Sequence, residues 1–132
     1  MKKVLFVCIE NSCRSQMAEG FANQFGKEVV EAYSAGSKPS GEVDPKAIEV
    51  MKEAGIDIST QYSKGFYDLP TKELDYVISL GCQDTCPFFP AKKHIYWNIK
   101  DPEGKDIEFF RRTRDQIKKM VYNLIKDFKD QL

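Results

Sequence analysis

Short apolar runs alternate with amphipathic helical patterns along this chain. Residues 4–7 form a continuous apolar run, which is typical of a strand buried on both faces. Apolar residues then recur at helical spacing, which predicts a helix over residues 15–25, and Gly26 stands where a left-handed C-terminal cap is expected. The alternation continues with predicted strands at 29–33, 75–80 and 94–99 and predicted helices at 45–54 and 107–128.

Strands that alternate with helices are joined by right-handed crossovers and form a parallel sheet. We therefore expect an α/β fold, a three-layer sandwich with a four-stranded parallel sheet and helices on both faces. A length of 132 residues fits one domain, so we assign residues 1–132 to a single domain. Ligands of such folds bind beyond the carboxyl ends of the strands, and the first of these ends lies at Val7 and Cys8.

Composition excludes several classes of protein. Twenty basic residues balance twenty acidic ones, so no overall positive field exists to hold nucleic acid. The longest apolar run, residues 4–9, is far shorter than the ~20 residues that span a bilayer and has no cleavage site of a secretory signal. We expect a cytoplasmic protein without a membrane or nucleic-acid partner. Four cysteines in a reducing compartment indicate catalysis, redox chemistry or metal binding.

The loop between the first strand and the first helix, Cys8-Ile-Glu-Asn-Ser-Cys-Arg14-Ser15, carries the residues best suited to chemistry. Its backbone N–H groups lie at a helix N-terminus, which favours both a tetrahedral anion and a thiolate. Cys8 is the predicted nucleophile, Arg14 can bind two oxygens of an oxyanion, and Ser15 can hydrogen-bond the Cys8 sulfur. The predicted oxyanion-binding loop comprises Ile9, Glu10, Asn11, Ser12, Cys13 and Arg14.

The remaining loop residues have supporting roles. Asn11 and Ser12 are short and polar, suited to left-handed or turn geometry, and we expect them to hold the loop open. A Glu10 carboxylate that pointed inward would oppose anion binding, so we expect this side chain to point to solvent. Cys13 has no assigned task beyond a place in the loop.

Residues 7–20, Val-Cys-Ile-Glu-Asn-Ser-Cys-Arg-Ser-Gln-Met-Ala-Glu-Gly, resemble the signature of arsenate reductases built on the low-molecular-weight protein tyrosine phosphatase fold. Stretches at 34–36, 57–59, 77–82 and 101–105 match in order, so the resemblance covers essentially the whole chain. It implies a low-molecular-weight tyrosine phosphatase-like sandwich and a role in arsenical resistance and detoxification.

This superfamily contains arsenate reductases and phosphatases, and both activities use the equivalents of Cys8 and Arg14. Reduction of arsenate to arsenite takes two electrons and therefore two thiols, whereas hydrolysis of a phosphate ester consumes none. A phosphatase has no need of Cys82 and Cys86, and Gln16 stands where the phosphatases usually carry proline. These details favour the reductase. A phosphatase that forms a phosphocysteine at Cys8 is the alternative.

The resemblance also implies a catalytic sequence. Cys8 attacks arsenate while Asp101 protonates the departing oxygen. Cys82 then attacks the Cys8 adduct, which releases arsenite, and Cys86 resolves the Cys8–Cys82 disulfide. Thioredoxin reduces the final disulfide; glutaredoxin or a low-molecular-weight thiol is the alternative reductant. We expect a monomer with no tightly bound cofactor and no metal.

Two other readings of these residues are weaker. Four thiolates, at residues 8, 13, 82 and 86, make a closed zinc site, but their spacing differs from that of such sites and Arg14 would have no purpose. An interaction protein with an inactive anion pocket would lack a catalytic residue that is present here.

Some family members also bind potassium at the equivalents of Asn11, Glu19 and Ser34. In this chain Lys64 stands at the fourth position of that site, and its ammonium group can replace the charge of the ion.

Overall fold

The computed structural model describes residues 1–81 and 90–132, and Cys82 and Cys86 lie outside these ranges. The elements follow the predicted alternation with small shifts at their ends. In chain order they are β1 (Lys2–Cys8), α1 (Arg14–Phe25), β2 (Val30–Gly36), α2 (Pro45–Glu53), the 3-10 helix η1 (Phe66–Asp68), β3 (Tyr76–Leu80), β4 (Lys93–Trp97) and α3 (Ile107–Asp130).

The four strands form one sheet in the order β2-β1-β3-β4, and every neighbouring pair is parallel. The predicted four-stranded parallel sheet is confirmed. Cys8 pairs with Gly36 of β2, and Val7 pairs with Ser79 of β3. The carboxyl ends of the strands therefore share one edge, where Arg14 at the start of α1, Gly81 after β3 and Ile99 after β4 meet.

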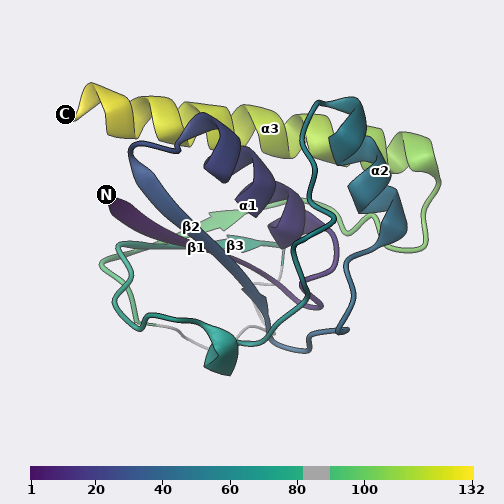
Figure 1. Ribbon diagram of the computed structural model, residues 1–132, viewed down its shortest axis with the longest axis horizontal. Helices are drawn as coiled ribbons and strands as arrows, with labels where there is room; N and C mark the ends of the chain where they lie inside the picture. The colour runs from purple at the N-terminus through teal and green to yellow at the C-terminus, as the bar shows by residue number, and fades with distance from the viewer. Residues whose placement is uncertain (82–89) are drawn as a thin grey trace.

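Helices α1, α2 and α3 lie on the same side of the sheet (Figure 1). Their apolar faces bury the larger core cluster, which includes Phe6, Phe21, Met51, Phe110 and Ile117. The short helix η1 lies on the opposite side, where its Phe66 packs against a smaller cluster that contains Leu5, Val7 and Val77. The sheet is thus covered on both faces, as the predicted α/β sandwich requires.

Local signals set the starts of two helices. The Asp44 side chain accepts a hydrogen bond from the N–H of Lys46 over 2.8 Å, and Pro45 occupies the first turn of α2. The Asp106 side chain caps α3 by accepting from the N–H of Phe109 over 2.9 Å.

The predicted left-handed cap at Gly26 is wrong, because its φ is −115°. A Cβ atom at this position would lie 2.7 Å from both Ile125 Cδ1 and Val30 Cγ2. Close packing between the end of α1 and its neighbours, and not a special backbone angle, requires glycine here. Ile125 is also buried on α3, and Leu124 packs partly buried against the same core.

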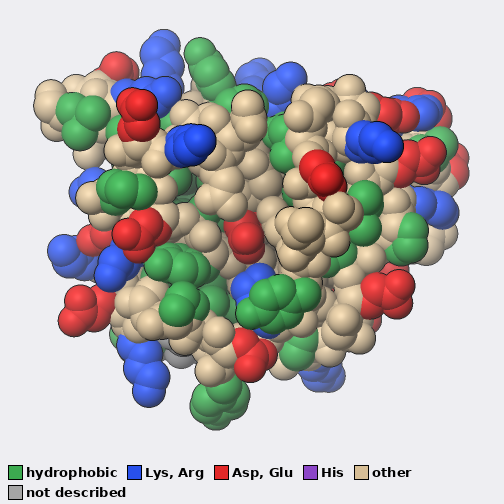
Figure 2. All heavy atoms as spheres, in the orientation of Figure 1, with side chains coloured by type: hydrophobic (Ala, Val, Ile, Leu, Met, Phe, Trp, Pro, Cys, Tyr) green, Lys and Arg blue, Asp and Glu red, His purple; other side chains and the backbone are tan. Residues whose placement is uncertain are grey.

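Basic and acidic side chains are interspersed over the face shown in Figure 2. In the described ranges, every helix is too short or too polar to cross a membrane.

Candidate active site

The loop between β1 and α1 is held from outside by the segment that follows β2. The carbonyl oxygens of Ile9, Glu10 and Ser12 accept hydrogen bonds from backbone N–H groups of residues 38–44, over 2.8, 3.0 and 2.9 Å. The C=O of one residue and the N–H of the next lie on opposite sides of a planar trans peptide. The N–H groups that follow these three carbonyls therefore face the inside of the loop, as an anion cradle requires.

Asn11 gives the loop its tight curvature. Its φ of +52° is the only positive φ at a non-glycine residue in the described ranges, and asparagine tolerates this conformation well. The predicted left-handed or turn geometry is confirmed for this residue. Its side chain is fully buried and donates from Nδ2 to Ser15 Oγ over 2.7 Å.

Cys8 ends β1 at the base of this loop. Its side chain is buried, and Sγ lies 2.8 Å from Ser15 Oγ in the first turn of α1. The predicted contact between the two residues is therefore present. The thiol stands at the N-terminus of α1, where the helix dipole and the inward N–H groups favour negative charge.

Arg14 begins α1 at the end of the loop and is only 4% exposed. Its Nη1 donates to the carbonyl oxygen of Ile99 over 2.9 Å, and its Nη2 lies 3.7 Å from Asp101 Oδ2. Its buried Nε has no hydrogen-bond partner among residues 1–81 and 90–132. A buried guanidinium with an uncommitted N–H matches an oxyanion ligand.

Asp101 reaches the site from the segment after β4, and its side chain is 44% exposed. The structure thus brings Arg14, from α1, beside the acid that the sequence proposed as proton donor.

Gly81 is a site residue whose role the sequence analysis did not identify. Its φ is +81°, and an added Cβ would overlap Arg14 Nη1 and lie 2.5 Å from the carbonyl oxygen of Ile99. The end of β3 therefore approaches the Arg14–Ile99 hydrogen bond so closely that only glycine fits. A glycine at a strand end facing the ligand edge was the available signal.

The expectation that Glu10 points to solvent is wrong. Its Oε2 atom is buried, and the Glu103 carboxyl lies beside it. The hydrogen bond between the two carboxyls, burial and nearby negative charges raise the pKa of Glu103 to about 7.

Cys13 is buried beside Ser12 and Asp44, with its Sγ 3.7 Å from Asp44 Oδ2. Burial raises the pKa of this thiol well above its ordinary value. Cys13 therefore stays protonated and is a poor nucleophile. Within residues 1–81 and 90–132, no three His, Cys, Asp or Glu side chains are grouped to hold a metal ion; the zinc alternative also involves Cys82 and Cys86, outside these ranges.

The fold described above, with a cysteine and an arginine in a loop between a parallel strand and a helix, is found in a known protein family. Residues 3–132 match the low molecular weight phosphotyrosine protein phosphatase family, and the chain belongs to this family. Its similar relatives include proteins named arsenate reductases. The glutaredoxin arsenate reductase of Synechocystis sp. is 46% identical over 128 residues, which cover 95% of this chain and 97% of the relative. The arsenate reductase of Staphylococcus xylosus is 43% identical over 125 residues, 92% and 95% of the two chains.

Solved structures show the same relationship. An arsenate reductase in the phosphate binding state has 44% identity and a TM-score of 0.86, over 97% of this chain and 99% of the other. An arsenate reductase in the oxidized state has 43% identity and a TM-score of 0.87 over the same shares. The resemblance inferred from residues 7–20 is confirmed, and so is the low-molecular-weight tyrosine phosphatase-like fold.

Proposed function

We propose that this protein reduces arsenate to arsenite and that Cys8 is the nucleophile. The observation that carries the proposal is the buried Cys8 sulfur, hydrogen-bonded to Ser15, at the base of a loop that ends at the buried Arg14. Inward N–H groups and an uncommitted Arg14 Nε–H suit the oxygens of a tetrahedral oxyanion. The relatives named arsenate reductases support arsenate as that oxyanion.

In the first step the Cys8 thiolate attacks arsenic and one As–O bond breaks. The departing oxygen takes a proton from Asp101 and leaves as water. The position of Asp101 beside Arg14 supports this role, because the proton donor then faces the same ligand as the guanidinium.

In the second step the Cys82 thiolate attacks the Cys8 sulfur. The electron pair of the S–As bond stays on arsenic, so arsenic is reduced to arsenite and a Cys8–Cys82 disulfide forms. Cys86 then attacks Cys82 and releases the Cys8 thiolate. Gly81 immediately precedes Cys82 and lies against Arg14, which supports delivery of this thiol to the site.

An external thiol completes the cycle by reducing the Cys82–Cys86 disulfide. We propose thioredoxin in the cytoplasm as this partner, with no tightly bound cofactor. Glutaredoxin or a low-molecular-weight thiol is the second candidate, favoured by the glutaredoxin arsenate reductase among the relatives. An assay of arsenate-dependent NADPH oxidation, run once with thioredoxin and thioredoxin reductase and once with glutathione, glutaredoxin and glutathione reductase, separates the two.

A single-turnover experiment tests the cascade. Reduced protein is mixed with arsenate without a reductant, and arsenite and disulfides are measured. We expect one arsenite per chain from the wild type and from Cys86→Ser, with a Cys82–Cys86 and a Cys8–Cys82 disulfide respectively. Cys8→Ser and Cys82→Ser should form none, whereas Cys13→Ser, the matched control thiol, should behave like the wild type. Arsenite formation by Cys8→Ser would refute the proposal.

Hydrolysis of phosphate monoesters through a Cys8 phosphocysteine is the second candidate, because the chain belongs to a phosphatase family. It needs Cys8 and Arg14 but consumes no electrons. Turnover of p-nitrophenyl phosphate by a Cys82→Ser, Cys86→Ser double variant measures this activity separately from reduction.

A further inference from the structure

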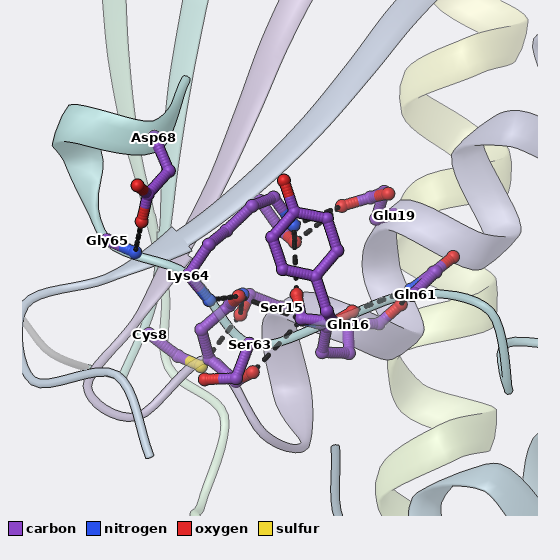
Figure 3. A network of polar contacts seen from close by, with 12 residues as sticks. Cys8, Ser15, Gln16, Glu19, Gln61, Ser63, Lys64, Gly65 and Asp68 are labelled. Atoms are coloured by element: carbon purple, nitrogen blue, oxygen red, sulfur yellow. Dashed lines mark hydrogen bonds and ion pairs between the residues drawn. The ribbon is translucent and has the colours of Figure 1, made fainter. Parts of the chain in front are cut away.

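We propose that Gln16 and Gln61 are positioning residues that direct the Ser15 hydroxyl proton onto the Cys8 sulfur. Gln16 lies in the first turn of α1 and is fully buried, and Gln61 lies half-buried in the segment between α2 and η1. Figure 3 shows them side by side, with their polar contacts leading toward Ser15. The inference rests on the proposed function, because it concerns the thiolate that arsenate reduction requires.

The orientation of Gln61 is fixed by the backbone. Its Nε2 donates to the backbone carbonyl oxygen of Gln16 over 3.0 Å, and that oxygen can only accept. The same Nε2 lies 2.7 Å from Gln16 Oε1. Gln16 Oε1 is therefore the acceptor from Gln61, and the Gln16 amide nitrogen must face the other way.

Two further backbone carbonyls agree with this orientation of Gln16. Its Nε2 donates to the carbonyl oxygens of Asn11 over 3.0 Å and Tyr62 over 2.8 Å. Nε2 has two protons for three acceptors, so the proton on the Asn11 side is shared between the carbonyl oxygen and Asn11 Oδ1, which lies 2.8 Å away. Asn11 Oδ1 also accepts a hydrogen bond from the backbone N–H of Lys64 over 2.9 Å. Two donors converge on the Asn11 oxygen, so the Asn11 amide nitrogen faces Ser15.

The last link follows from proton counting. Asn11 Nδ2 donates to Ser15 Oγ over 2.7 Å, and Cys8 Sγ lies 2.8 Å from the same oxygen. A Cys8 thiolate has no proton to give, so in that state the single hydroxyl proton of Ser15, whose oxygen accepts from Asn11, is donated to the sulfur. A donor aimed at sulfur stabilises the thiolate, and burial of Cys8, Asn11, Ser15 and Gln16 keeps water from competing.

The test measures the thiol itself. Alkylation of Cys8 by iodoacetamide is followed against pH, and the modified peptides are sequenced to distinguish Cys8 from Cys13, Cys82 and Cys86. In Gln16→Met, which removes the donor to Asn11 Oδ1, we expect alkylation of Cys8 near pH 7 to fall about tenfold and the profile to move to higher pH. Gln61→Met should give a smaller shift in the same direction.

Two controls separate positioning from stability. Gln24→Met changes an exposed glutamine on the same helix and should leave the profile unchanged. Ile117→Val loosens the buried face of α3 away from the loop and should lower stability without moving the profile. An unchanged profile in folded Gln16→Met would overturn the proposal, as would an equal shift in Ile117→Val. If Gln16→Met does not fold, the outcome rests on Gln61→Met in the same way.

Arsenate kinetics give an independent second readout. Gln61→Met should lower kcat more than it raises KM, because the hydrogen bonds of Gln61 go to Gln16 and not to the backbone of the oxyanion-binding loop. Should the wild type fail to reduce arsenate, the proposed function falls while the alkylation profiles still decide the roles of the two glutamines.

Discussion

Arg14 Nη2 lies 3.7 Å from Asp101 Oδ2, although the two residues come from opposite ends of the site, one on α1 and the other after β4. The Arg14–Ile99 hydrogen bond draws the second segment against the guanidinium. The group that binds the oxyanion and the group proposed to donate a proton thus share one fixed geometry.

Arg14→Lys should reduce kcat/KM for arsenate by at least about a hundredfold. Lysine keeps the positive charge but cannot bond Ile99 and the oxyanion together through a planar fork. Steady-state kinetics in the coupled reductant assay measure the loss. Activity within a few fold of wild type would show that charge alone is sufficient.

Asp101→Asn should slow the first chemical step and leave anion binding nearly unchanged. The substitution removes the proton donor but keeps the shape of the side chain beside Arg14. Rapid-quench measurement of arsenite formation and competition by phosphate report the two properties separately. Weaker phosphate competition with unchanged chemistry would contradict the proton-donor role.

Gly81→Ala should weaken arsenate binding, because the added Cβ displaces the Arg14 guanidinium. Gly104→Ala is a matched control: Gly104 also has a positive φ, of +77°, but a Cβ there meets nothing within 4 Å. Each variant should lose about 1 kcal/mol of stability from backbone strain alone. Only Gly81→Ala should also raise KM, and equal KM values in the two variants would argue against the contact.

Glu103→Gln should change the pH dependence of stability. The folded-state pKa of Glu103, raised to about 7 from an ordinary 4.5, means that folded protein retains a proton that the unfolded chain releases between these values. The stability that this group contributes is therefore lost as pH rises through that window. We expect the Tm advantage of Glu103→Gln over wild type to be larger at about pH 8 than at about pH 5. Exposed Glu49→Gln is the control and should show no such trend.

Potassium should not stimulate this protein. Lys64 Nζ lies 3.2 Å from Ser34 Oγ and from the Tyr62 carbonyl oxygen and 3.6 Å from Glu19 Oε1, so an ammonium already neutralises this acidic position. We expect equal kcat/KM for arsenate in potassium and sodium salts at the same ionic strength. A clear rise with potassium would show that the cation still binds there.

Features that depend on residues close together along the chain were predictable from the sequence. Apolar runs located the strands, helical spacing located the helices, and Cys8-x5-Arg14 located the loop. The parallel arrangement of the strands also followed, because strands that alternate with helices are joined by crossover connections.

The site contacts made between distant segments were decided by the tertiary structure. Gln61 reaches Gln16 across 45 positions, and Arg14 reaches Ile99 across 85. Gly26 shows the same limit, since the packing of Ile125 and Val30, and not its own φ, excludes a side chain. The periodicity of apolar residues shows which face of a helix or strand is buried. Which residues pack against that face depends on how the helices and strands assemble. Hydrogen-bond partners from distant segments are therefore fixed only once the sheet and helices have assembled.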